Sequence, residues 1–141
     1  MARHKHIHLT AEDIANLNLS EIGLLLNRFG RAVVPEYNIP AVKALMKEQG
    51  MKTRNINMSC DPGHGWAKVK RRELAKLGIL DKITSFSYQK GDYVYLEEDM
   101  DLSTYLIALK AQHGENLRFV FVSTHSNKQS RIRNYTPFAA L

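Results

Sequence analysis

The chain has 141 residues and a formal net charge of +6, from 20 Lys and Arg against 14 Asp and Glu. This length predicts one domain, or one domain with a small addition, and 44% hydrophobic residues suffice for a globular core. The single cysteine, Cys60, excludes an intramolecular disulfide scaffold. No apolar run approaches the ~18 residues of a membrane span, so we expect no membrane partner and a cytoplasmic location.

The first part of the chain has helical patterns. A short helix is predicted over residues 10–17, and a longer one over residues 20–33, where apolar side chains recur every three or four positions. Another helix is predicted over residues 40–50, from a proline to a glycine. We therefore predict an N-terminal helical segment, residues 1–50, in front of a core domain, residues 51–141.

The core domain alternates between strand and helix patterns. In chain order we predict a strand at 54–60, a turn at 61–65, a helix at 70–77, strands at 83–88 and 93–97 joined by a hairpin turn, a helix capped by Asp99 or Asp101 and ended by Gly114, and a strand at 117–123. The order β-α-β-β-α-β is that of a ferredoxin-like fold, an antiparallel four-stranded sheet with two helices on one face. The predicted fold class is thus α+β, ferredoxin-like with an N-terminal helical extension.

The charge is distributed unevenly. Residues 1–50 carry a net +1, residues 51–80 carry +5, residues 81–116 carry −4 and residues 117–141 carry +4. If folding brings the two basic blocks together, they form a patch that attracts phosphate groups. The alternative is a dispersed, solvated surface that only keeps the chain soluble.

The six residues DPGHGW, at 61–66, bring together a carboxylate, an imidazole, two glycines and the only tryptophan. One interpretation is a recognition loop, because glycines let backbone N–H groups approach an anion and an indole offers a stacking face. Its ligand-binding residues would be Asp61, Gly63, His64 and Gly65. The other interpretation is a tight turn whose Trp66 fills the core and whose His64 bonds to Asp61.

Several segments resemble a group of short proteins of phages and mobile elements. They are SCDPGHGW at 59–66, LGILDKI at 77–83, SYQKG at 87–91, YLEED at 95–99 and RIRNY at 131–135. The resemblance covers residues 57–138, and members of the group begin near the position of Met58, which makes residues 1–50 an added element. It implies an accessory protein that acts inside a bacterial cell.

Two shorter segments, 61–65 (DPGHG) and 121–127 (FVSTHSN), are similar to the histidine motifs of zinc-dependent N-acetylmuramoyl-L-alanine amidases. That likeness implies a zinc ion held by His64, Glu73 and His125, which would activate water to attack an amide. Two histidines on one zinc need ring nitrogens within about 4 Å of each other. In a ferredoxin-like sheet the first and last strands run antiparallel, which puts the ends of these strands about 20 Å apart. The expected topology therefore favours a binding protein over an amidase.

We expect a small intracellular protein of phage type that binds nucleic acid, or a nucleic-acid-associated host complex, without catalysis or a cofactor. Its expected contact residues are Trp66, Lys68, Lys70, Arg71, Arg72, Lys128, Arg131 and Arg133. One alternative is a zinc-dependent peptidoglycan amidase. Another is a protein inhibitor of a host defence system that uses the helical segment.

Overall fold

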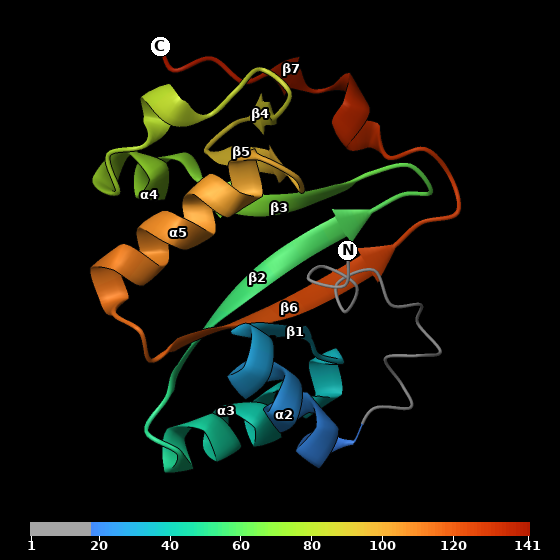
Figure 1. Ribbon diagram of the computed structural model, residues 1–141. Helices are drawn as coiled ribbons and strands as arrows, with labels where there is room; N and C mark the ends of the chain where they lie inside the picture. The colour runs from blue at the N-terminus through green and yellow to red at the C-terminus, as the bar shows by residue number, and fades with distance from the viewer. Residues whose placement is uncertain (1–17) are drawn as a thin grey trace. The chain divides into compact units, whose positions relative to one another are not determined.

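The computed structural model describes residues 18–141, so the helix predicted over residues 10–17 lies outside the described part. The chain forms two compact units. The described residues of the first unit are 18–56 and 115–123, and the second unit consists of 57–114 and 124–141. Strands β2 (Lys52–Cys60) and β6 (Leu117–His125) contribute to both units (Figure 1). The first unit thus takes in a late segment of the chain as well as the N-terminal one.

In the first unit, two helices pack on a pair of parallel strands. The helices are α2 (Leu19–Phe29) and α3 (Ile39–Glu48), and β1 (Arg31–Val33) pairs parallel with β6. The 3-10 turn η2 (Glu36–Asn38) leads into α3. The core of this unit consists of Ile22, Leu26, Ala32, Val34, Val42, Met46 and Val120. The N-terminal segment is therefore α/β rather than wholly helical.

Helix α2 ends earlier than the apolar pattern predicts. Asn18 caps its start, accepting from the backbone N–H of Glu21 at 2.9 Å, while the Glu21 carboxylate accepts from the N–H of Asn18 at 3.3 Å. Gly30 ends the helix in the left-handed region with φ 78°. Val33 therefore belongs to β1 instead of the helical stripe.

In the second unit, an antiparallel arrangement of strands is covered by α5 on one face. Neighbouring strands follow the order β2, β3, β5, β4, β7. The bounds are β3 (Gly65–Lys70), α4 (Arg71–Lys76), η3 (Leu80–Lys82), β4 (Tyr88–Lys90), β5 (Tyr93–Glu97), α5 (Asp101–His113), η4 (Arg131–Asn134) and β7 (Thr136–Pro137). Helix α5 buries Leu102, Tyr105, Leu106 and Leu109. The predicted hairpin is confirmed, because β4 and β5 pair antiparallel around the turn at Gly91.

The order of elements differs from the predicted ferredoxin-like pattern by two additional strands. Residues 65–70 form β3 and residues 136–137 form β7, which makes the order β-β-α-β-β-α-β-β, and α4 begins only at Arg71. Residues 83–87 form turns instead of the predicted strand, because the buried Asp101 carboxylate binds the Thr84 and Ser87 hydroxyls at 2.8 and 2.6 Å. The cap of α5 also differs, since the Glu97 carboxylate accepts from the first N–H groups of that helix. The fold is α+β with a mixed sheet.

The pairing of β2 with β6 corrects the strand directions that we expected. The N–H of Lys52 donates to the carbonyl of Asn116 at 3.0 Å, and the N–H of Ser126 donates to the carbonyl of Cys60 at 2.9 Å. The start of one strand thus lies beside the start of the other, and the ends also coincide, so the strands are parallel (Figure 1). The segments that follow Cys60 and His125 begin at the same end of the sheet. The expected separation of about 20 Å was therefore derived from a wrong strand direction.

A search of residues 18–141 for membrane-spanning helices finds none that is sufficiently long and apolar.

Candidate nucleic-acid interface

The two faces of the sheet in the second unit differ in character. On one face the buried residues Ala67, Val69, Val94 and Leu96 form the core. On the other face, Lys68 of β3 is paired with Tyr95 of β5, and Lys70 is paired with Tyr93. This face therefore carries lysines and tyrosines. The sheet itself thus sets up a basic, aromatic surface.

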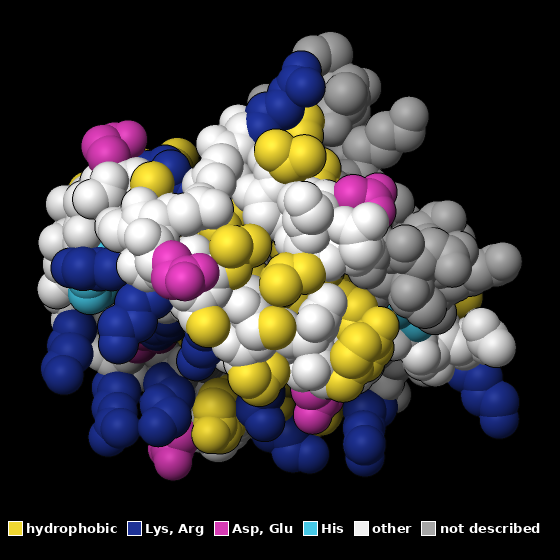
Figure 2. Space-filling model, turned by 90° about the horizontal axis from the view of Figure 1, so that it is seen from below, with side chains coloured by type: hydrophobic (Ala, Val, Ile, Leu, Met, Phe, Trp, Pro, Cys, Tyr) yellow, Lys and Arg dark blue, Asp and Glu magenta, His cyan; other side chains and the backbone are white. Residues whose placement is uncertain are grey.

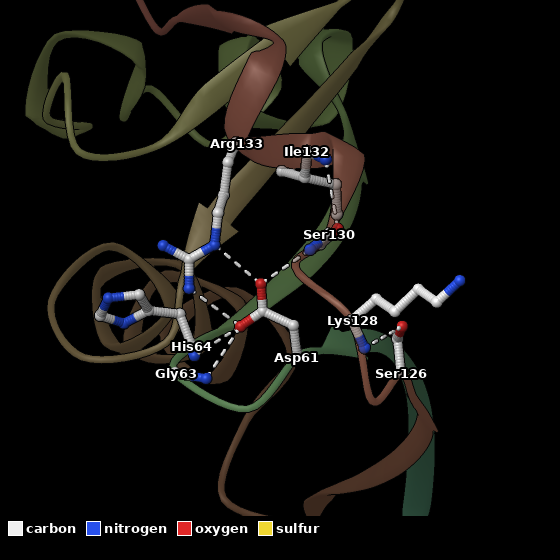
Figure 3. A network of polar contacts seen from close by, with 8 residues as sticks. All are labelled: Asp61, Gly63, His64, Ser126, Lys128, Ser130, Ile132 and Arg133. Carbon is white, nitrogen blue, oxygen red and sulfur yellow. Dashed lines mark hydrogen bonds and ion pairs between the residues drawn. The ribbon is translucent and has the colours of Figure 1, made fainter.

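The C-terminal segment is fixed beside this face by the Asp61 network, which consists of Asp61, Gly63, His64, Ser130 and Arg133 (Figure 3). Asp61 Oδ1 accepts from the backbone N–H groups of Gly63 and His64 at 3.0 and 2.9 Å. Its Oδ2 accepts from the N–H of Ser130 at 2.9 Å. Arg133 forms a bidentate pair with both oxygens, at 2.7 and 2.9 Å.

These bonds determine the charge states of the network. The Arg133 guanidinium, together with the N–H groups of Ser130, His64 and Gly63, holds the pKa of the Asp61 carboxyl well below its usual range despite burial. The same hydrogen bonds raise the pKa of the Arg133 guanidinium. Because Asp61 already takes the N–H groups of Gly63 and His64, the loop does not offer them to an external anion. The loop is thus closed on its own carboxylate.

Trp66 belongs to the interior rather than to a stacking surface. Its side chain is 3% exposed, and the guanidinium carbon of Arg133 lies 5.3 Å from its ring centroid. The ring centroid of His64, in the turn before β3, lies 6.1 Å from that of Trp66. At Gly65, which starts β3, an added Cβ would lie 3.1 Å from the Cys60 sulfur, a tight contact that the neighbouring side chains would have to accommodate. The interpretation of a tight turn with a core tryptophan is therefore correct for Trp66.

Arg71 also has an internal role. Its guanidinium donates to the backbone carbonyls of Ala139 and Ala140 at 3.0 and 2.7 Å, and to Gln89 at 3.0 Å. It also lies 5.2 Å from the ring centroid of Phe138. Arg71 thus anchors the end of the chain, and its N–H donors are engaged within the fold.

Three of the expected contact residues converge on one cavity, which we call the basic groove. It has a volume of about 600 Å³, and its lining includes Lys68, Tyr95, His125, Lys128, Arg131 and Tyr135. Lys68 comes from β3, whereas Lys128 and Arg131 come from the segment that follows β6. The lining contributed by residues 18–141 contains no Asp or Glu. The two basic blocks of the sequence therefore meet here.

Two tyrosines form the wall of the basic groove. The rings of Tyr95 and Tyr135 have centroids 5.1 Å apart, and Lys90 lies 4.7 Å from the centroid of Tyr135. Burial raises the pKa of the Tyr95 phenol, and the neighbouring Tyr135 and Tyr93 act in the same direction, while Arg131 opposes them. Both tyrosines are half-buried, so part of each ring is accessible.

Cys60 also lines the basic groove. Burial, with the nearby carboxylates of Glu98 and Asp61, raises the pKa of the Cys60 thiol to about 11. The thiol is therefore almost entirely protonated at neutral pH, which makes it a weak nucleophile.

The remaining expected contacts, Lys70 and Arg72, lie elsewhere. They line a separate cavity of about 590 Å³ together with Arg71 and Tyr93. Both side chains are exposed. The eight expected residues are thus divided among the basic groove, this second cavity and the interior.

The residues suggested for zinc do not form one ligand set. Glu73 accepts a hydrogen bond from the Tyr105 hydroxyl at 2.7 Å, which places it between α4 and α5. His125 lines the basic groove, whereas His64 lines a different cavity beside Trp66 and Arg133. Within residues 18–141, no three His, Cys, Asp or Glu side chains are grouped as metal ligands. The donor set that the amidase likeness implies is therefore not assembled.

The first unit presents another kind of surface. Its exposed large hydrophobic side chains are Leu19, Leu24, Phe29 and Tyr37, of which Leu24 and Tyr37 are 69% and 74% exposed. Figure 2 shows one face of the protein on which hydrophobic side chains gather beside Lys and Arg side chains. This apolar character contrasts with the lysines and tyrosines on the sheet of the second unit.

Tyr135 and Lys90 are the members of the interface that the sequence did not reveal. The alternation of Tyr93 and Tyr95 in a predicted strand places these two on one face, and this signal is visible in the sequence. No local pattern places Tyr135, because its position depends on how the Asp61 network folds the C-terminal segment back onto the sheet.

We compared the chain with protein-family models, with curated proteins and with solved structures. None of the three comparisons finds a match.

Proposed function

We propose that this protein binds nucleic acid through the basic groove of its second unit and does so without catalysing a reaction. The observation that supports this most directly is the convergence of Lys68, Lys128 and Arg131 on one cavity whose described lining contains no carboxylate. Because the described lining contains no carboxylate, its cations are available to attract phosphate oxygens.

The chemistry of the groove matches a polyanion that also carries aromatic rings. Lysine and arginine side chains neutralise phosphates and release counterions, which drives association. The accessible parts of Tyr95 and Tyr135 offer ring faces to bases. A simple anion would use the cations alone, so the tyrosines favour nucleic acid over other polyanions.

A binding role also agrees with the state of Cys60, the one thiol in the groove. Its raised pKa, about 11, leaves little thiolate for a nucleophilic reaction at neutral pH. We also propose, on the resemblance to phage proteins alone, that this binding occurs inside a bacterial cell, where the partner is a nucleic acid or a host complex that contains one.

The test is binding of a fluorescently labelled oligonucleotide, followed by anisotropy at increasing KCl. Three groove cations predict a slope of log K against log salt of roughly −2 for a single strand. The double variant Lys128→Glu, Arg131→Glu should lose at least about tenfold in affinity and show a shallower slope. The control is Lys76→Glu, Lys82→Glu, which changes the net charge equally at two other exposed positions.

Equal weakening by the two double variants would contradict the proposal, because it would show attraction by net charge alone. Affinity that does not change with salt would contradict it as well. Urea unfolding of each variant should give the stability of the original protein, since these side chains are exposed.

A further inference from the structure

The basic groove is one of several cavities on the same side of the second unit, and these cavities adjoin one another. A middle cavity of about 600 Å³ includes Arg71, Lys90, Gly91 and Tyr135 in its lining. It shares Tyr135 with the basic groove. It shares Arg71 and Gly91 with the cavity of Lys70 and Arg72, which we call the far cavity. Each cavity in this series therefore shares lining residues with the next, and we call the series the track.

Each cavity of this track has cations and a tyrosine ring in its lining, and the far cavity also contains the carboxylate of Asp92. Lys128, Arg131 and Lys68 stand at the basic groove, Lys90 at the middle cavity, and Lys70 with Arg72 at the far cavity. The rings between them are Tyr95, Tyr135 and Tyr93. Tyr93 lies opposite Lys70 in the β3–β5 pair, and Lys68 lies 4.2 Å from its ring centroid. This is the arrangement that a strand with regularly spaced phosphates and bases requires.

From this arrangement we infer that the ligand is a single-stranded nucleic acid that lies along the whole track, from the basic groove to the far cavity. The inference rests on the proposed function and specifies its substrate. Phosphates contact the lysines and arginines, and bases stack on the tyrosines. Lys90 lies over the ring of Tyr135, and Lys68 lies over the ring of Tyr93. A base that stacks on one of these rings displaces the ammonium group. Because both lysines are exposed, the displaced group can then contact a phosphate.

A duplex fits the same surface less well. Its bases are stacked inside the helix, so their faces cannot reach the tyrosines. The longest helix in residues 18–141 is α5. The side of α5 that carries Leu102, Tyr105 and Leu109 is buried, so it is not available to enter a major groove. The track is formed by half-exposed sheet side chains such as Tyr93 and Tyr95, on the face of β5 opposite Val94 and Leu96. The shape and chemistry of the track therefore favour unpaired bases.

The experiment compares labelled oligothymidylates of about four and about twelve nucleotides with a duplex of about twelve base pairs. Three variants are measured: Lys70→Glu with Arg72→Glu in the far cavity, Lys128→Glu with Arg131→Glu in the basic groove, and the control Lys76→Glu with Lys82→Glu. We expect the longer strand to bind more tightly than the short strand and the duplex. The far-cavity variant should weaken binding of the longer strand about tenfold and leave the short strand unchanged, whereas the groove variant weakens both.

Tyr135 gives a test that does not depend on charge. Tyr135→Leu should weaken binding of the longer strand about tenfold, because a stacking face is lost. Tyr135→Phe retains the ring and should bind as the original protein does. Circular dichroism and urea unfolding establish that both variants are folded.

The outcomes separate the two proposals. If the duplex binds as tightly as the strand, or if the far-cavity variant leaves the longer strand unaffected while the groove variant weakens it, the inference is overturned and the proposed function stands. If no oligonucleotide binds in a salt-dependent manner, the proposed function is overturned as well.

Discussion

Two neighbouring regions of the second unit use basic residues of the same sequence blocks in opposite ways. In the Asp61 network, Arg133 points toward a buried carboxylate and donates to it from two of its nitrogens, Nε and Nη2 (Figure 3). In the basic groove, Lys128 points away from that carboxylate (Figure 3), and the described lining holds no acid. The comparison teaches that a cluster of cations in a sequence contains both structural and binding residues. For Arg133 and Lys128, the contact with the carboxylate of Asp61 separates the two roles.

The largest expected effect is the loss of the carboxylate that defines the network. Asp61→Ala leaves the N–H groups of Gly63, His64 and Ser130 without their acceptor and Arg133 without its counter-ion. We expect the free energy of unfolding to fall by about 3 kcal/mol. Urea denaturation measures it, and Asp81→Ala, at an exposed carboxylate, is the control. An equal, small loss in both variants would show that the network contributes little.

Two arginines only two residues apart sharpen the comparison further. Arg133→Gln should lower the melting temperature and leave the salt dependence of oligonucleotide binding unchanged, because Arg133 is paired with Asp61. Arg131→Gln should leave the melting temperature unchanged and reduce the slope of log K against log salt by about 0.7. Thermal unfolding and anisotropy provide the two readouts. If both variants change the same property, the proposed division between network and groove is wrong.

The Asp61 network should also make the protein sensitive to acid. The pKa of Asp61 in the folded protein lies below its value in the unfolded chain, so its contribution is complete above about pH 4 and is lost as the pH falls toward the folded pKa. Urea unfolding at several pH values below about pH 5 tests this. In Asp61→Asn the slope against pH should be lower by the equivalent of about one proton. An unchanged slope would mean that other carboxylates account for the acid sensitivity.

The smallest expected effect concerns Trp66, the only tryptophan. Because its side chain is 3% exposed, its emission should be insensitive to acrylamide and unchanged when an oligonucleotide binds. Unfolding in urea, which exposes the ring, is the positive control. Quenching of Trp66 by the oligonucleotide in the folded protein would instead support the stacking role that the sequence suggested.

Local patterns in the sequence predicted those elements whose limits depend on nearby residues. The hairpin of β4 and β5 follows from the turn residues between them, and α5 follows from the helical spacing of Leu102, Leu106 and Leu109. Strand β3 was missed because the glycine at its start is typical of a turn. The strand pattern is nevertheless present, since buried Ala67 and Val69 alternate with exposed Lys68 and Lys70. This glycine lies in a strand, where an added Cβ would make a tight contact with the Cys60 sulfur.

The strand directions and the composition of the site depend on contacts between distant residues. Whether β2 and β6 are parallel is set by the pairing of Cys60 with Ser126, which no local pattern encodes. The basic blocks were visible in the sequence, but the capture of Arg133 by Asp61 and of Arg71 by the chain end was not. Of the expected contact residues, Lys68, Lys128 and Arg131 line the basic groove, whereas Trp66 and Arg133 are held within the fold.

The division of the chain into units has a consequence for protein synthesis. Strand β1 pairs with residues 119–121, and Val120 belongs to the first core with Ile22 and Val42. At ~5–20 residues per second, a ribosome needs roughly 3 to 12 s to advance from residue 56 to residue 117. During that interval the helices of the nascent first unit lack their partner strand, and their apolar sides are open to chaperones.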